Sequence, residues 1–175
     1  MLAHVPRQLG SWLTWDVGQK KMTDAQIKEL VARLDTSKSL EEEEVWATLK
    51  PLGVAIVPFL AEAYAKMKRA DGRRSCVFHS MKFGRSSEAA FQLGIAALND
   101  RATLVRYRAC GLLAYSLRRD AVPHLQALLQ HPDARTAEDA GAAIDAIEAQ
   151  NHHFFRDRDH SGRTFWELNP GDIPK

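Results

Sequence analysis

The segment from residue 104 to residue 133 is the feature that most constrains how this chain can fold. It contains two short helical patterns joined by a polar turn, and the second pattern begins at a proline, Pro123. A helix pair of this length cannot bury its own apolar face, so it requires similar pairs stacked beside it. The sequence therefore predicts an array of helix pairs, with further copies elsewhere in the chain.

Other copies are recognisable from the proline-led helix. The residues around Pro58 match those around Pro123, and the two prolines are 65 residues apart, close to twice the length of a helical repeat. A degenerate third copy surrounds Phe91 and ends at Asp100, much as the later unit ends at Asp133. Apolar residues at helical spacing support this third copy although its proline is replaced.

These helix pairs with a proline-led second helix resemble HEAT repeats. The resemblance implies an all-α fold, a short HEAT-like α-α superhelix, and a ladder of buried Asp–Arg pairs between successive repeats. Asp100 and Arg106 are expected to form one rung of that ladder, and Arg74 is expected to correspond to Arg106 one repeat earlier. In the last repeat Thr136 and Ala137 take the places of Val105 and Arg106, so we expect the rung to be lost there.

The helix starts also carry recognisable signals. Thr23 with Gln26, and Ser39 with Glu42, have the spacing of capping boxes, and each precedes apolar residues at helical spacing. The acidic run 41–44 is explained by the preference of carboxylates for the N-terminal end of a helix.

The chain is expected to be one domain, 1–175, because its length suits one core or one short solenoid. Within it we expect a non-helical N-terminal cap at 1–20, helical repeats at 21–150 and a C-terminal hairpin or tail at 151–175. Aromatic pairs on both sides of a polar turn, His153-Phe154-Phe155 and Phe165-Trp166, favour a β-hairpin there.

Composition excludes several classes of protein. The formal net charge is only +2, and the one basic run, 66–74, is short, so nucleic acid is not the expected partner. No signal-peptide pattern or transmembrane run is expected, and Cys76 and Cys110 lie in apolar helical patterns typical of reduced, buried thiols. These observations predict a cytoplasmic protein that has no membrane partner.

One short motif has the beginning of a calcium loop. Asp157, Asp159, Ser161 and Gly162 match the first, third, fifth and sixth positions of an EF-hand loop, but the twelfth position is Leu168, which has no carboxylate. We therefore expect an ordinary turn here and no metal site.

The sequence does not predict an enzyme, and no cofactor is expected. The chain has no Gly-x-Ser-x-Gly motif, no phosphate-binding glycine loop and no His-Glu dipeptide of the kind found in iron-dependent HEAT-repeat hydroxylases. Bilin lyases and HEAT-like DNA glycosylases remain alternatives, although the inner helices expected here are not rich in arginine or lysine.

What remains is a protein-binding module. The whole pattern is similar to small stand-alone bacterial HEAT-repeat proteins, several of which are immunity proteins that bind and block a toxin made by the same cell. The resemblance implies a cognate toxin as partner; the alternative is a general scaffold or regulatory subunit. The residues expected to face a partner are Glu62, Lys66, Gln92, His124 and Gln126.

Overall fold

The structure is a computed structural model that describes residues 22–173, and this part of the chain is all-α. The α-helices are α1 (Asp24–Ala32), α2 (Ser39–Leu49), α3 (Val57–Tyr64), α4 (Ala70–Ser80), α5 (Glu88–Ala97), α6 (Thr103–Ser116), α7 (Val122–Gln126) and α8 (Ala134–Glu148). Short 3₁₀ helices occur at η1 (Lys50–Ile56), η2 (Met81–Phe83), η3 (Arg119–Ala121) and η4 (His152–Phe155). The expected N-terminal cap at 1–20 lies outside the described residues.

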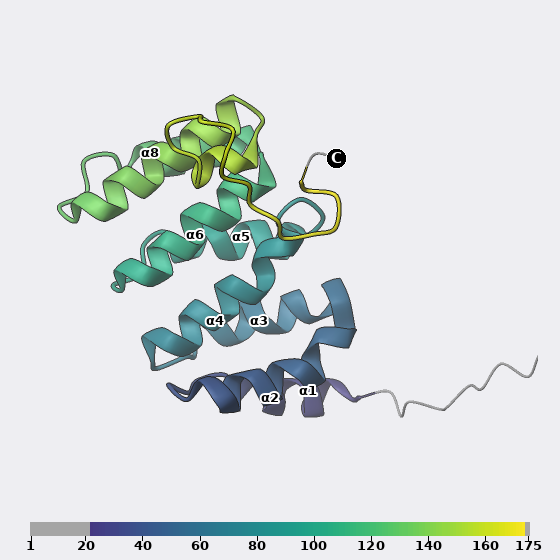
Figure 1. The fold of residues 1–175 in the computed structure, drawn as a ribbon. Coiled ribbons are helices and arrows are strands. Elements are labelled where there is room, and N and C mark those ends of the chain that lie inside the picture. The colour runs from purple at the N-terminus through teal and green to yellow at the C-terminus, as the bar shows by residue number, and fades with distance from the viewer. Residues whose placement is uncertain (1–21, 174–175) are drawn as a thin grey trace, which may run out of the picture.

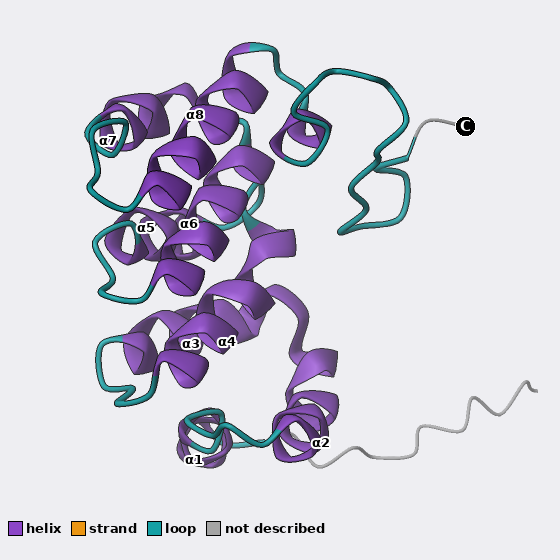
Figure 2. Ribbon diagram, turned by 60° about the vertical axis from the view of Figure 1, so that its left-hand side comes forward, coloured by secondary structure: helices purple, strands orange, loops and turns teal. Residues whose placement is uncertain are grey.

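The helices alternate between two layers as the chain proceeds from α1 to α8 (Figure 1). The odd layer consists of α1, α3, α5 and α7, and the even layer of α2, α4, α6 and α8 (Figure 2). Within the layers α1 packs on α3 and α3 on α5, while α4 packs on α6 and α6 on α8. Between the layers α3 packs on α4, α5 on α6 and α7 on α8. The helices α1, α3, α4, α5, α6 and α8 therefore each pack against a neighbour in sequence and a neighbour in their own layer.

Two clusters of buried side chains form the core. One joins α1, α2 and α3 with Met67, Cys76 and Ala90, and the other joins α5, α6 and α8 with the C-terminal segment. Tyr64 packs against both clusters. Close approach of α5 to α6 depends on Gly94, since a β-carbon there would lie 2.9 Å from the side chain of Leu112.

The helix starts follow the predicted rules only in part. Thr23 and Gln26 form the predicted capping box. Ser39 does not cap α2, because Lys38 holds the N-cap position and Glu42 instead accepts hydrogen bonds from Arg74 and Ser75 of α4. The side chain of Glu42 is thus used for packing between two helices of the even layer.

A repeated set of buried ion pairs links successive helix pairs, but with other partners than predicted. The carboxylate of Asp100 accepts from Arg73, at 2.6 Å from Nε and 3.1 Å from Nη2, whereas Arg106 reaches only the backbone carbonyl of Asp100. The carboxylate partner of Arg106 is Asp133, at 2.7 Å. Arg106 therefore corresponds to Arg73, not Arg74.

The last rung is also retained where its loss was predicted. In addition to its pair with Asp133, Arg106 donates from Nε to Thr136 Oγ1 at 2.8 Å. Thr136 in turn donates to Asp133, which is the N-cap of α8. The Thr136 hydroxyl and the N-capping carboxylate of Asp133 together satisfy the guanidinium.

The predicted C-terminal hairpin is wrong. Residues 152–155 form the 3₁₀ helix η4, and the described residues after it contain no strand. Phe155 and Trp166 are buried side by side against Gly111 of α6, where a β-carbon would lie 3.0 Å and 3.2 Å from their rings. Packing onto α6 leaves these aromatic residues on one buried surface, so the alternation of a hairpin does not develop.

One stretch of the described chain, Ser39–Tyr64, is long and apolar enough by length and composition to cross a membrane, which the sequence analysis did not anticipate. It is not a straight helix, because it comprises α2, η1 and α3 with a break at Gly53, where φ is 59° and ψ is −135°. Val57 and Leu60 of its last part are fully buried in the core.

The Arg73–Asp100 pair gives the first prediction. Burial alone would raise the pKa of Asp100, but hydrogen bonds from Arg73, the Ala102 amide and Tyr64 outweigh burial and hold that pKa below its ordinary value. Replacing Asp100→Asn leaves the Arg73 guanidinium buried without a counter-charge, so the free energy of unfolding should fall by about 3 kcal/mol or more. Urea denaturation at neutral pH measures this change.

The exposed pair Arg118–Asp120 provides the control, because Asp120→Asn should change the free energy of unfolding by less than about 1 kcal/mol. The pH dependence follows from the lowered pKa of Asp100: its stabilisation is complete above the unfolded-state pKa and is lost as the pH falls below about 4. The difference between wild type and Asp100→Asn should therefore shrink in acid. Equal stabilities at neutral pH would contradict the assigned pair.

Candidate protein-binding surface

All five residues predicted to face a partner are exposed, and all five belong to the odd layer or follow one of its helices. Glu62 lies on α3, Lys66 follows that helix, Gln92 lies on α5, and His124 and Gln126 lie on α7. Their exposure agrees with the helical pattern from which they were chosen. Their role in binding stays a prediction.

Among the five residues, the side-chain hydrogen bonds and ion pairs of the structure join only Glu62 and Lys66. Glu62 lies between two lysines, with its carboxylate 2.7 Å from Lys66 Nζ and 3.0 Å from Lys28 Nζ of α1. Hydrogen bonds from Lys66 and then Lys28, with the charges of both, lower the pKa of Glu62 to about 2. Glu62 is therefore ionised at every physiological pH, and the three exposed side chains form a charge triad.

Gln92 belongs to a different polar group further along the odd layer. Its amide donates to Glu88 at 2.7 Å, and Glu88 pairs with Arg118. The Arg118 guanidinium lies 3.5 Å from the centre of the Phe91 ring, a cation–π geometry. These contacts fix Gln92 against its own helix and separate it from the triad around Glu62.

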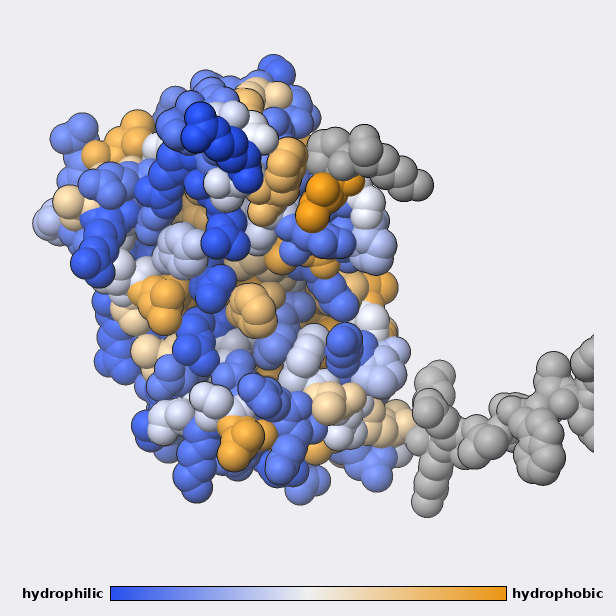
Figure 3. All heavy atoms as spheres, in the orientation of Figure 1, coloured by the Kyte–Doolittle hydropathy of each residue, from blue (hydrophilic) through white to orange (hydrophobic). Residues whose placement is uncertain are grey.

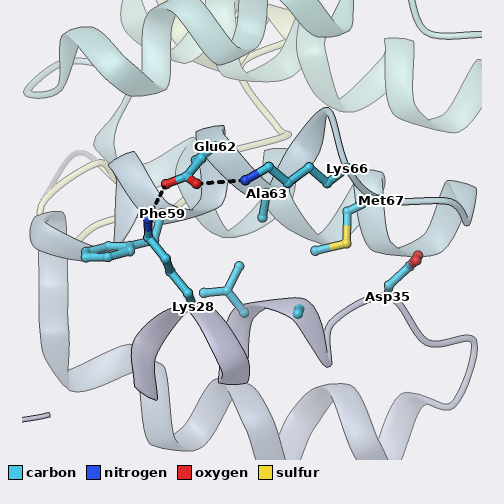
Figure 4. A pocket seen from close by; sticks show the side chains of 9 residues that line it. Lys28, Asp35, Phe59, Glu62, Ala63, Lys66 and Met67 are labelled. Carbon is cyan, nitrogen blue, oxygen red and sulfur yellow. Dashed lines mark hydrogen bonds and ion pairs between the residues drawn. The ribbon is translucent and has the colours of Figure 1, made fainter. Parts of the chain in front are cut away.

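A groove between α1 and α3 lies beside the charge triad (Figure 4). Its empty volume is about 560 Å³, and it opens to solvent. Apolar atoms come from Val31, Phe59, Ala63 and Met67, while charged side chains border it. We call this the α1–α3 groove. An apolar cleft bordered by ordered charges is the usual geometry for holding a side chain of a partner.

Sequence reasoning missed the groove although its pattern is present. Phe59, Ala63 and Met67 follow one another at intervals of four residues, which places them on one side of α3 and its extension. Such a row of apolar residues is interpreted as part of the hydrophobic core unless the position of the neighbouring helix is known. Here α1 covers it only in part, because Lys28 and Asp35 occupy the positions of α1 and its following turn that border the row.

Asp35 closes one end of the groove. Its carboxylate accepts from the backbone amides of Lys68 and Arg69 at 3.0 Å and 2.9 Å, so it ties the turn after α1 to the start of α4. Gly72 permits this approach, since a β-carbon there would lie 2.6 Å from Asp35 Oδ1 and 2.8 Å from its Cα. This end of the groove is thus held by hydrogen bonds from backbone amides to the Asp35 carboxylate.

The two cysteines do not offer a nucleophile. Cys76 and Cys110 are fully buried, and burial raises the pKa of each thiol to about 12. A thiolate is the reactive form of cysteine, so neither side chain is activated. Among residues 22–173 no group of three or more His, Cys, Asp and Glu side chains has an arrangement that could hold a metal ion.

The segment with the partial calcium motif forms a closed turn. Asp157 is buried and accepts from Ser161 Oγ at 2.6 Å and from the Gly162 amide at 2.7 Å, which occupies both of its carboxylate oxygens. His160 and Gly162 adopt positive φ angles of 54° and 70°. Asp159 is exposed. The Asp157 carboxylate therefore serves the turn itself, as an Asx-type turn requires.

No protein-family model matches the chain, and no curated protein matches it. The resemblance to HEAT repeats accordingly stays a prediction that depends on the residues described above.

The turn gives a second prediction. Removing the carboxylate in Asp157→Ala should lower the melting temperature in the presence of EDTA, because two hydrogen bonds of the turn are lost. Adding calcium should change the melting temperature of neither protein, and calorimetric titration should show no binding heat. A calcium-dependent rise in the wild type that is absent from Asp157→Ala would establish a calcium site.

Proposed function

We propose that the chain is a HEAT-like solenoid that acts by binding another protein and not by catalysis. The observation that carries the proposal is the α1–α3 groove, in which an apolar floor is bordered by the Lys28–Glu62–Lys66 triad. The triad sets charges of both signs beside the apolar floor, so polar groups of a partner meet a complementary border there. Because both cysteines are buried as thiols, neither offers a nucleophile for catalysis, which agrees with a binding role.

The solenoid proposal is supported by the repeated ion pairs. Arg73 with Asp100 and Arg106 with Asp133 have the same separation of 27 residues. Each arginine also donates to a backbone carbonyl six residues before it, Met67 for Arg73 and Asp100 for Arg106. Equal contacts at a fixed interval are what stacked repeats produce. A solenoid offers its exposed helix faces as a broad, rigid binding surface.

The specific function we propose is immunity: the protein binds a toxin made by the same cell, in the cytoplasm, and blocks the toxin's active site or substrate surface. Support comes from the resemblance to small bacterial immunity proteins of this type and from the groove, whose mixed apolar and charged lining suits a protein segment. An apolar side chain would enter between Phe59 and Met67 while its neighbours met the charged border.

Immunity is tested with the toxin candidate encoded beside the gene. The purified chain should co-elute with that toxin in size-exclusion chromatography, and its expression should restore growth to cells that produce the toxin. A toxin that neither co-elutes nor is neutralised ends the immunity proposal. Binding to a different protein of the same operon would instead point to a scaffold or regulatory subunit.

The groove itself is tested by charge reversal. Glu62→Lys places three cations around one border, so the affinity for the toxin should fall about tenfold or more, which corresponds to about 1.4 kcal/mol of binding free energy. Glu148→Lys is the matched control, because Glu148 is exposed at the end of α8, far along the chain from the groove. Isothermal titration gives both affinities, and equal values for the two variants would remove the groove from the interface.

A further inference from the structure

A second surface, on the even layer, has a composition that the sequence did not reveal. Phe78 of α4 is 42% exposed and Leu104 of α6 is 48% exposed, although both are large and apolar. Tyr107 and Arg108 lie on the same helix as Leu104. We call these four residues the Arg108 patch. Apolar side chains interrupt the hydrophilic surface over the region of α4 and α6 in Figure 3.

Arg108 is the unusual member of the patch. Its guanidinium lies 4.8 Å from the centre of the Phe78 ring and 5.4 Å from that of Tyr107. Its Nε is buried and has no hydrogen-bond partner among the described residues, and the guanidinium forms no ion pair with those residues. The Arg108 guanidinium is thus a half-buried cation near two aromatic rings, and no anion among the described residues pairs with it. The terminal Nη atoms of Arg108 are not among the buried unpaired atoms and also form none of the hydrogen bonds or ion pairs of these residues, so they are the donors that a partner's acceptor can reach.

Two neighbouring cations make the binding of an anion at Arg108 more favourable. Burial, and then the nearby cations Arg74 and Arg156, lower the pKa of Arg108 despite the opposing effect of Tyr107. Arg74 is itself neutralised by Glu42 at 3.0 Å and Asp71 at 3.6 Å. Arg156 is exposed. Arg108 is therefore the one member of this group whose charge is both partly desolvated and uncompensated within residues 22–173.

We propose that the Arg108 patch docks an acidic, apolar segment of a protein partner, with one carboxylate on the Arg108 guanidinium and adjacent apolar side chains on Phe78 and Leu104. A guanidinium that lies 4.8 Å from an aromatic ring centre can still donate from its terminal nitrogens to a carboxylate. Arginine and exposed aromatic residues are also the side chains that most often dominate protein interfaces. The inference rests on the proposed binding function but concerns the opposite layer from the α1–α3 groove.

The charges of the surroundings favour a protein over a nucleic acid. A phosphate backbone needs several unpaired cations in a row, whereas Arg74 beside Arg108 is already paired with Glu42 and Asp71. The N-terminal segment 1–21 of the same chain does not have the composition of an acidic occupant of the patch. Its only carboxylate, Asp16, is outnumbered by Arg7, Lys20 and Lys21. A separate acidic protein segment fits both the charge and the exposed apolar area.

The probe for this surface is a short fluorescein-labelled peptide of alternating aspartate and leucine, titrated into the full chain and followed by fluorescence polarisation. The peptide should bind, and Arg108→Leu should weaken binding roughly tenfold or more, because a charge-assisted hydrogen bond is lost. In ¹⁵N spectra the Nε–Hε resonance of Arg108 should shift on peptide addition. This resonance is assigned by its absence from Arg108→Lys.

Three controls make the result specific. Arg119→Leu removes an exposed arginine from η3 and should leave peptide binding unchanged, and a matched asparagine–leucine peptide should bind much less tightly. A fluorescein-labelled single-stranded oligonucleotide should bind less tightly than the acidic peptide. Failure of the acidic peptide to bind, equal binding by Arg108→Leu, or tighter binding of the oligonucleotide would each overturn the proposal.

The outcome is independent of the toxin experiment. Glu62→Lys should bind the acidic peptide as the wild type does, because Glu62 belongs to the α1–α3 groove. If the toxin is not bound but the peptide result holds, only the immunity proposal fails. If the toxin is bound and Arg108→Leu changes neither measurement, only the Arg108 patch fails.

Discussion

The buried contact between Arg73 and Asp100 is the interaction on which the arrangement of the helix pairs depends. Asp100 lies in the turn after α5, and Arg73 lies on α4, so the pair joins two successive units. Tyr64 at the end of α3 donates to the same carboxylate at 2.8 Å, which adds a third helix to the junction. Burial raises the pKa of the Tyr64 hydroxyl, so the phenol remains a donor. A carboxylate that accepts from two side chains and a backbone amide fixes the angle between units more tightly than apolar contacts do.

The C-terminal segment is held by a comparable set of polar contacts. His152 lies between a backbone carbonyl, Trp166 O at 2.8 Å from Nε2, and the Arg85 guanidinium at 2.9 Å from Nδ1. A carbonyl only accepts and a guanidinium only donates, so His152 is neutral with its proton on Nε2. Burial lowers its pKa, which agrees with this state. Asp172 accepts from Tyr115 and from two backbone amides, and so fastens the end of the segment to α6.

The parts of the structure that the sequence predicted are those determined by local pattern. The all-α class, the Thr23–Gln26 capping box and the exposure of Glu62 and Gln92 follow from helical spacing and from residues three or four apart. The partner of Asp100 did not follow, because a shift of one residue between Arg73 and Arg74 cannot be chosen without knowing which side of α4 faces α5. The C-terminal segment was misjudged for a related reason: Phe155 and Trp166 take their positions from Gly111, more than forty residues earlier.

The same distinction explains why one candidate surface was foreseen in part and the other was not. Glu62 was identified because a charged residue on an amphipathic helix stands out from its neighbours, but its lysine partner Lys28 comes from a different helix. Arg108 gave no signal in the sequence, since it lies in an apolar stretch where an arginine is expected to extend its charge to solvent. Only the positions of Phe78 and Tyr107 around it show that its guanidinium is held back against the surface. A cation retained in this way gains most from an anion brought by another molecule, which is the reason we propose a second binding surface on the even layer.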